Sequence, residues 1–130
     1  MRFIPTNIHG IIDYIVGIAL IAAPWLFGFA FGGAETWVPV IIGAAIIIYS
    51  LFTDYEWGVF RKLKMETHLG LDIGFGLVLA VSPWLFGFAG IVWVNHLLVG
   101  LLFIGAGILT KTVPSKERVG RKRTGETTTV

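Results

Sequence analysis

The sequence contains no cysteine, and charged residues make up only 14% of its 130 positions. Without cysteine there is no disulfide, no thiolate nucleophile and no thiolate metal ligand. Soluble domains carry roughly 25% charged residues, whereas this chain is 55% hydrophobic. One domain of this length cannot cover so much apolar surface with so few charges, so we expect the chain to face lipid.

The motifs of common enzymes are absent as well. There is no H-E-x-x-H, no G-x-S-x-G and no P-loop, the patterns typical of zinc proteases, serine hydrolases and nucleotide-binding sites. The glycine clusters lie in apolar or loop contexts rather than after a strand. We therefore expect no enzymatic activity, no cofactor and no nucleic-acid partner.

Three long stretches lack charge altogether. They cover residues 14–34, 36–53 and 73–110, which are 21, 18 and 38 residues long. A membrane span needs about 20 residues, so the longest stretch must turn back, and the glycines of 87–90 mark the turn. The sequence thus predicts an all-α bundle of four transmembrane helices, over about 8–29, 36–53, 67–87 and 91–111.

All 10 Lys and Arg residues lie outside these spans or at their ends. With four spans they share one side of the membrane, and the positive-inside rule makes that side cytoplasmic. We expect a cell-membrane protein with both termini in the cytoplasm and anionic lipid headgroups as partners of its basic residues. Those residues are Arg61, Lys62, Lys64, Lys111, Lys116, Arg118, Arg121, Lys122 and Arg123.

The segments outside the spans carry two further patterns. Within 54–66, Trp57, Phe60 and Leu63 recur every three residues among basic side chains, which predicts a short amphipathic helix lying at the cytoplasmic interface. Residues 113–130 combine a basic run with threonine, glycine and proline. Such a composition cannot build a core, so we expect a disordered cytoplasmic tail.

The chain contains an internal repeat. At an offset of 59 residues, His9, Asp13 and Gly17 recur as His68, Asp72 and Gly76, and the hexapeptide PWLFGF recurs as well. The repeated unit is a two-helix hairpin, the first in 1–53 and the second in 67–112. Because each unit holds two spans, both enter from the same side, and a parallel repeat about a pseudo-twofold axis along the membrane normal is expected.

The hexapeptide begins with proline, which removes a backbone donor and clashes with the carbonyl four residues before it. Helices should therefore kink or end near Pro24 and Pro83, at glycine-containing turns. The hexapeptide aromatics are expected to form a belt at the outer interface. The full motif consists of Pro24, Trp25 and Gly28, with Phe27 and Phe29, and of Ser82, Pro83, Trp84 and Gly87, with Phe86 and Phe88.

Ser82-Pro83-Trp84 resembles the signature of the SPW-repeat membrane proteins, small bacterial and archaeal integral proteins that carry this hairpin once or twice. The resemblance extends over about residues 6–110, although the first copy has Ala23 in place of the serine. It implies a membrane-embedded helical hairpin repeat, and it implies no particular biochemical activity.

The repeated histidines and aspartates are the strongest chemical candidates. A spacing of four places His9 over Asp13, and His68 over Asp72, on one helical face, which should turn away from lipid. The pseudo-twofold axis would then bring all four together near the cytoplasmic boundary. Three interpretations stay open. The residues can form structural pairs without a metal, they can bind Zn²⁺ or another divalent ion, or they can form a proton or ion pathway.

Small residues suggest close helix packing, either within one chain or between chains. Gly70 and Gly74 have G-x-x-x-G spacing. The other candidate packing positions are Gly17, Gly43, Gly76 and Gly100. His96 has no counterpart in the first copy and is interpreted as a polar residue at the outer interface.

The sequence leads to two functional hypotheses. The first is a non-enzymatic structural or accessory membrane protein that self-associates. The alternative is a small proton or cation channel or transporter in which His9, Asp13, His68 and Asp72 form the ion site.

Overall fold

The computed structural model describes residues 1–114, which contain four helices and no strand. The predicted all-α fold is confirmed, and the helix ends lie within three residues of those expected from the sequence. The helices are α1 (Thr6–Leu26), α2 (Ala34–Phe52), α3 (Met65–Leu85) and α4 (Val94–Leu109).

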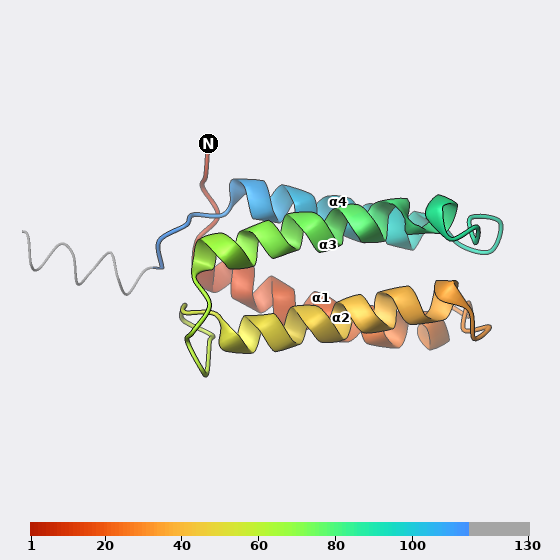
Figure 1. Cartoon of the computed structure of the whole chain (residues 1–130), viewed down its shortest axis with the longest axis horizontal. Helices are drawn as coiled ribbons and strands as arrows, with labels where there is room; N and C mark the ends of the chain where they lie inside the picture. The colour runs from red at the N-terminus through yellow and green to blue at the C-terminus, as the bar shows by residue number, and fades with distance from the viewer. Residues whose placement is uncertain (115–130) are drawn as a thin grey trace, which may run out of the picture.

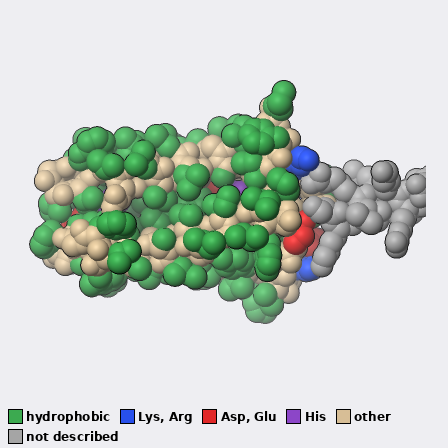
Figure 2. Space-filling view, turned by 180° about the vertical axis from the view of Figure 1, so that it is seen from behind, with side chains coloured by type: hydrophobic (Ala, Val, Ile, Leu, Met, Phe, Trp, Pro, Cys, Tyr) green, Lys and Arg blue, Asp and Glu red, His purple; other side chains and the backbone are tan. Residues whose placement is uncertain are grey.

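The helices form two hairpins. Figure 1 shows α1 beside α2 and α3 beside α4, with the two hairpins stacked along their length. By length and composition, α1, α2 and α3 can each cross a membrane, whereas α4 is a shorter apolar helix of 16 residues, about 24 Å at 1.5 Å per residue. Hydrophobic side chains cover the visible outer surface, and Lys and Arg gather at the end where α1 and α3 begin (Figure 2).

Glycine lines the closest approach within each hairpin. A Cβ atom at Gly43 would lie 2.6 Å from the carbonyl oxygen of Gly17, and a Cβ atom at Gly76 would lie 2.7 Å from that of Gly100. The two copies therefore use equivalent glycine pairs to bring their helix backbones together.

Gly70 and Gly74 have a different environment. A Cβ atom added at either position would meet nothing within 4 Å. The G-x-x-x-G face of α3 is thus turned away from the other described helices, and none of them packs against it.

The hexapeptide prolines lie in the last turn of their helices. α1 runs through Pro24 to Leu26 and α3 runs through Pro83 to Leu85, so each helix ends two residues after its proline. The next residues have the same backbone angles in both copies, φ −101° and ψ 4°. Gly28 and Gly87 then take positive φ angles of 74° and 75°, a conformation that glycine adopts without strain.

The positive-φ turns also correct the predicted aromatic belt. Trp25 and Trp84 are exposed as expected, but Phe29 and Phe88 are each only 4% exposed. The left-handed turn directs the chain back over the bundle, so the phenylalanine after it packs inward. His96 is likewise buried, at 1% exposure, between these two rings, so its polar side chain does not face the surface of the bundle.

Ser82 compensates for the proline in the second copy. The Ser82 hydroxyl donates to the carbonyl oxygen of Leu79 at 2.8 Å, the carbonyl that Pro83 leaves without an amide donor. We expect Ser82→Ala to lower the free energy of unfolding by about 1 kcal/mol. In a Pro83→Ala background the restored amide can donate instead, so the same change should cost little. Equal costs in both backgrounds, measured by unfolding in mixed micelles, would contradict this account.

The predicted interfacial helix in 54–66 is wrong. Residues 53–64 form an irregular loop in which Thr53 pairs with Leu63. Loop amides donate to the carbonyls of Leu51 and Phe52, groups at the end of α2 that have no partner within the helix. The need to satisfy these carbonyls outweighs the three-residue apolar spacing. The predicted disordered tail, with Lys116, Arg118, Arg121, Lys122 and Arg123, lies outside the described residues.

Candidate functional site

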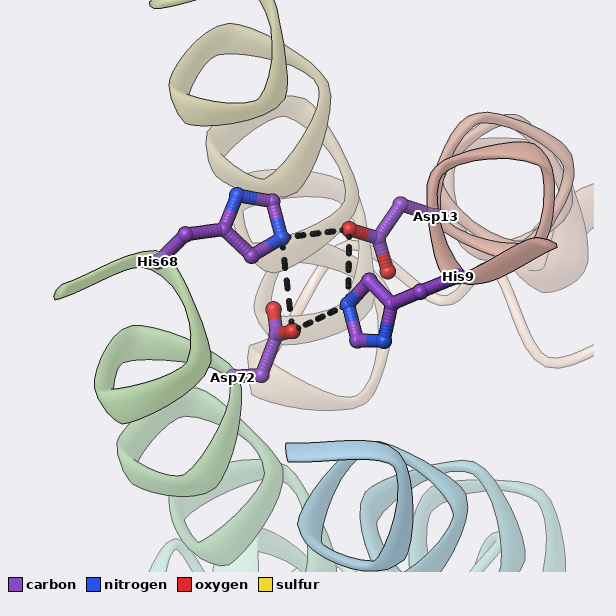
Figure 3. A group of neighbouring side chains, drawn as sticks. All are labelled: His9, Asp13, His68 and Asp72. Carbon is purple, nitrogen blue, oxygen red and sulfur yellow. Dashed lines mark hydrogen bonds and ion pairs between the residues drawn. The ribbon is translucent and has the colours of Figure 1, made fainter. Parts of the chain in front are cut away.

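Four ionisable side chains meet at the end of the bundle where α1 and α3 begin (Figure 3). α1 supplies His9 and Asp13, and α3 supplies His68 and Asp72. Each of these side chains is 0% exposed. We refer to these four residues as the His/Asp ring.

The shortest contacts of the ring cross between the two hairpins. His9 Nε2 lies 2.6 Å from Asp72 Oδ2, and His68 Nε2 lies 2.6 Å from Asp13 Oδ2. The contacts within one helix are longer, 3.2 Å for His9 and Asp13 and 3.4 Å for His68 and Asp72. Each histidine therefore pairs mainly with the aspartate of the other repeat, and nitrogen and oxygen atoms alternate around a closed circuit (Figure 3).

Each histidine also contacts a threonine through its second ring nitrogen. His9 Nδ1 lies 2.7 Å from Thr110 Oγ1, and His68 Nδ1 lies 2.7 Å from Thr53 Oγ1. The threonines follow α4 and α2 directly and are equivalent in the two copies. Neither threonine belongs to the predicted site, although each is the residue at which a charge-free stretch ends, and that shared position was the available signal.

One of these contacts fixes a proton. The Thr53 hydroxyl donates to the carbonyl oxygen of Tyr49 at 2.6 Å, so its oxygen must accept from His68 Nδ1. The opposite nitrogen, His68 Nε2, then faces Asp13 either as a lone pair or with a second proton. A neutral imidazole would direct its lone pair at a carboxylate, so this short contact requires a shared proton or another cation.

The surroundings of the ring depart from twofold symmetry. The hydroxyl of Tyr49 donates to Asp72 Oδ1, and Ser50 donates to Asp13 Oδ2 at 3.3 Å. Both donors come from α2, whereas α4 carries alanine and glycine at the equivalent positions. Asp13 Oδ1 is buried without a hydrogen-bond partner among the described residues. Tyr49 and Ser50 escaped the sequence analysis because it followed the residues that recur.

Tyr55, from the loop between the hairpins, covers the ring on one side. Its ring centroid lies 5.6 Å from that of His68, and the side chain is 1% exposed. Burial raises the pKa of the Tyr55 hydroxyl above its usual value of 10, so the group stays neutral at physiological pH. The loop thus adds bulk and no charge to the site.

The chain segments that lead into α1 and α3 cross to the other hairpin. Ile4 pairs with Thr110, and Leu63 pairs with Thr53. Arg2 donates to the carbonyl oxygen of Thr110 at 2.8 Å, near the negative end of the α4 dipole. The two crossings hold each histidine against the threonine that follows the second helix of the other hairpin.

The basic residues expected to contact lipid lie near this end. Arg61, Lys62 and Lys64 are exposed, and Lys111 is half-buried. Figure 2 shows Lys and Arg side chains at this end of the bundle together with acidic side chains. Contact with headgroups stays a prediction.

Comparison with known proteins supports the hairpin repeat. No curated protein and no solved structure matches the chain. A family model described as the SPW repeat domain matches residues 7–110, which include both hairpins and the whole His/Asp ring. The chain is therefore an apolar, multi-helix membrane protein that belongs to the SPW repeat family.

Proposed function

We propose that this integral membrane protein has a non-enzymatic structural or accessory role, and that the His/Asp ring clamps its two hairpins into one unit. The observation that carries the proposal is the exchange of partners across the hairpins, with both cross-contacts at 2.6 Å. A pair confined to one helix would stabilise that helix alone, whereas these contacts join α1 to α3.

Burial supports a clamp over an open ion path. All four ring side chains are 0% exposed, so none of them lines a channel that is open to water. Two carboxylates with two protonated imidazoles are neutral as a group, and a paired set of this kind is tolerated in a low-dielectric interior. Removing one partner of a buried pair typically costs about 3–5 kcal/mol, because the other charge is left unpaired, so loss of an aspartate should disrupt the contact between the hairpins.

The basic residues at the end of the bundle where α1 and α3 begin give the proposed orientation of the protein in the membrane. Arg61, Lys62 and Lys64 would contact anionic headgroups on the cytoplasmic side of the cell membrane, each contributing about 1 kcal/mol. Both termini would then lie in the cytoplasm, and no cofactor or nucleic acid is required.

The proposal includes self-association through α3. Gly70 and Gly74 leave a shallow hollow, bordered by Leu71, Phe75 and Val78. Small residues at this spacing allow two helix backbones to approach closely in lipid, and none of the helices in residues 1–114 occupies the position. A second copy of the chain is the proposed occupant.

A cleavable linker tests both parts of the proposal. A protease site inserted in the exposed stretch 59–62 would be cut after reconstitution in nanodiscs, and native mass spectrometry would then record the mass released. We expect the two halves to remain together, in assemblies of at least two chains. Asp13→Asn with Asp72→Asn should release the halves, whereas Gly74→Leu should reduce the assembly to one chain without releasing them.

The clamp and the self-association are contradicted by different results. Halves that separate in the unaltered ring would contradict the clamp, and a single chain with paired halves would contradict self-association. The transport alternative is tested in liposomes. Proton or cation flux that the two Asp→Asn changes abolish in a protein of unchanged helicity would replace the structural role with a transport role.

A further inference from the structure

The four inward-facing atoms of the His/Asp ring are all metal-ligating atoms. They are the Nε2 atoms of two histidines and the Oδ2 atoms of two aspartates. Taken around the circuit, neighbouring atoms are 3.2, 2.6, 3.4 and 2.6 Å apart. Zinc binds imidazole nitrogen and carboxylate oxygen at about 2.0–2.2 Å, which separates the ligands of a tetrahedral site by about 3.3 Å. The two within-helix separations already have about this value, the two cross-contacts would lengthen, and all four atoms lie within 4.8 Å of one another.

The groups behind the ligands are arranged as in a metal site. A metal-bound histidine usually donates its other ring N–H to a fixed acceptor, which sets the tautomer and the ring orientation. Thr53 is committed as an acceptor for His68 Nδ1 because its own proton goes to the Tyr49 carbonyl oxygen. Thr110 holds His9 Nδ1 at the same distance of 2.7 Å.

The carboxylates have outer partners as well. Tyr49 donates to Asp72 on the oxygen that faces away from the ring contacts, and Ser50 donates to Asp13. The remaining oxygen, Asp13 Oδ1, is fully buried and has no hydrogen-bond partner among the described residues. Figure 3 shows the Asp13 carboxylate directed toward both histidines. A cation bound by Asp13 Oδ2 would balance the charge of this carboxylate.

A divalent ion can balance the charge of the ring in place of two imidazole protons. Two aspartates and two neutral histidines carry a charge of −2, so one divalent cation makes the buried group neutral. The donor set contains nitrogen and oxygen and no sulfur, because the chain has no cysteine. Imidazole selects zinc, iron, copper or nickel over calcium and magnesium.

We propose that the His/Asp ring binds one divalent transition-metal ion, with Zn²⁺ as the best match, in a closed four-ligand structural site between the two hairpins. This inference deepens the proposed clamp and rests on the same residues. Of the three interpretations that the sequence leaves open, it favours the site for a divalent ion. With four protein ligands the site has no open position for substrate, which is typical of structural rather than catalytic zinc.

Burial indicates how the ion enters. Because each ligand side chain is 0% exposed, the ion must be acquired as α1 and α3 come together, so that metal binding and hairpin docking are coupled. The bound ion should therefore exchange slowly once the bundle has closed.

The metal content of the full chain tests the proposal. The chain would be produced without a polyhistidine tag in medium containing zinc, manganese and iron, reconstituted in nanodiscs and washed with chelator. Elemental mass spectrometry should find about one ion per chain, as expected for one site with four protein ligands. His9→Gln with His68→Gln should lower this content at least about ten-fold. His96→Gln is the matched control, because His96 is equally buried but lies outside the ring, and it should retain the ion.

A second variant keeps the proposal testable if the double histidine variant does not fold. Thr53→Val with Thr110→Val leaves all four ligands in place and removes only their outer partners. Loss of such partners typically weakens metal binding by about 10–100-fold, so this variant should lose its ion faster during dialysis against chelator.

One result would overturn the metal site: unaltered, helical protein that carries no more metal than the double histidine variant. Equal retention of the ion by the threonine variant and the unaltered chain would overturn the assignment of Thr53 and Thr110 as outer partners of the ligands. If the protein is free of metal and its cleaved halves stay together, the metal site is contradicted and the clamp between the hairpins is not. If the protein binds metal but its cleaved halves separate, the clamp is contradicted and the metal site is not.

Discussion

Asp72→Ala is expected to lower the free energy of unfolding by about 3–5 kcal/mol, the usual cost of removing one partner from a buried ionic pair. The change leaves His9 Nε2 without its 2.6 Å contact and leaves the Tyr49 hydroxyl without its acceptor. Both groups stay buried, because Tyr49 is only 8% exposed and His9 is not exposed at all. Unfolding in mixed micelles, followed by circular dichroism, measures the loss.

Glu66→Ala is the matched control for Asp72→Ala. Glu66 is an exposed carboxylate in the first turn of the same helix, and surface changes of this kind usually stay within about 0.5 kcal/mol. Exchanging the partners, with His9→Asp and Asp72→His in one chain, should recover part of the loss. If Asp72→Ala were as mild as Glu66→Ala, the ring would not stabilise the fold.

Gly100→Ala is expected to destabilise the contact between α3 and α4 strongly, although it adds only a single methyl group. A Cβ atom there would lie 2.5 Å from the carbonyl oxygen of Gly76 and 2.6 Å from the amide nitrogen of Ala80. Both are backbone atoms of α3, so the two helices must move apart. Overpacking of this kind typically costs about 1–3 kcal/mol, and the same micelle unfolding experiment measures it.

Gly105→Ala controls for the change in helix propensity. Gly105 lies in the same helix, but an added Cβ atom would meet nothing within 4 Å. Alanine is the better helix former by roughly 0.5–1 kcal/mol, so this variant should be neutral or slightly more stable. Equal destabilisation by the two alanines would mean that contact between α3 and α4 does not require the glycine.

Much of the fold could be predicted from the sequence because membrane spans depend on local composition. The charge-free stretches and the glycine turns predicted four helices, and the 59-residue offset predicted two equivalent hairpins. The same offset singled out His9, Asp13, His68 and Asp72, because a repeated polar pair within apolar helices must share one face. These inferences need only length, spacing and hydropathy.

The remainder depends on tertiary contacts that spacing does not encode. A spacing of four predicts that His9 meets Asp13, yet its closer partner is Asp72 on the other hairpin. Gly70 and Gly17 look alike in the sequence, but only Gly17 meets another helix. The loop after α2 has a helical apolar pattern, although the unpaired carbonyls at the end of α2 determine its path.

The crossed pairing of Ile4 with Thr110 and of Leu63 with Thr53 has an evolutionary consequence. The two contacts are equivalent. In one, the segment before α3 pairs with the end of α2, and in the other, the segment before α1 pairs with the end of α4. A gene encoding one hairpin would therefore complete the same circuit of contacts as a homodimer, and duplication with fusion would turn that dimer into a single chain. Tyr49 and Ser50 occur on one side only, a divergence that becomes possible once the two halves are inherited as separate segments of one gene.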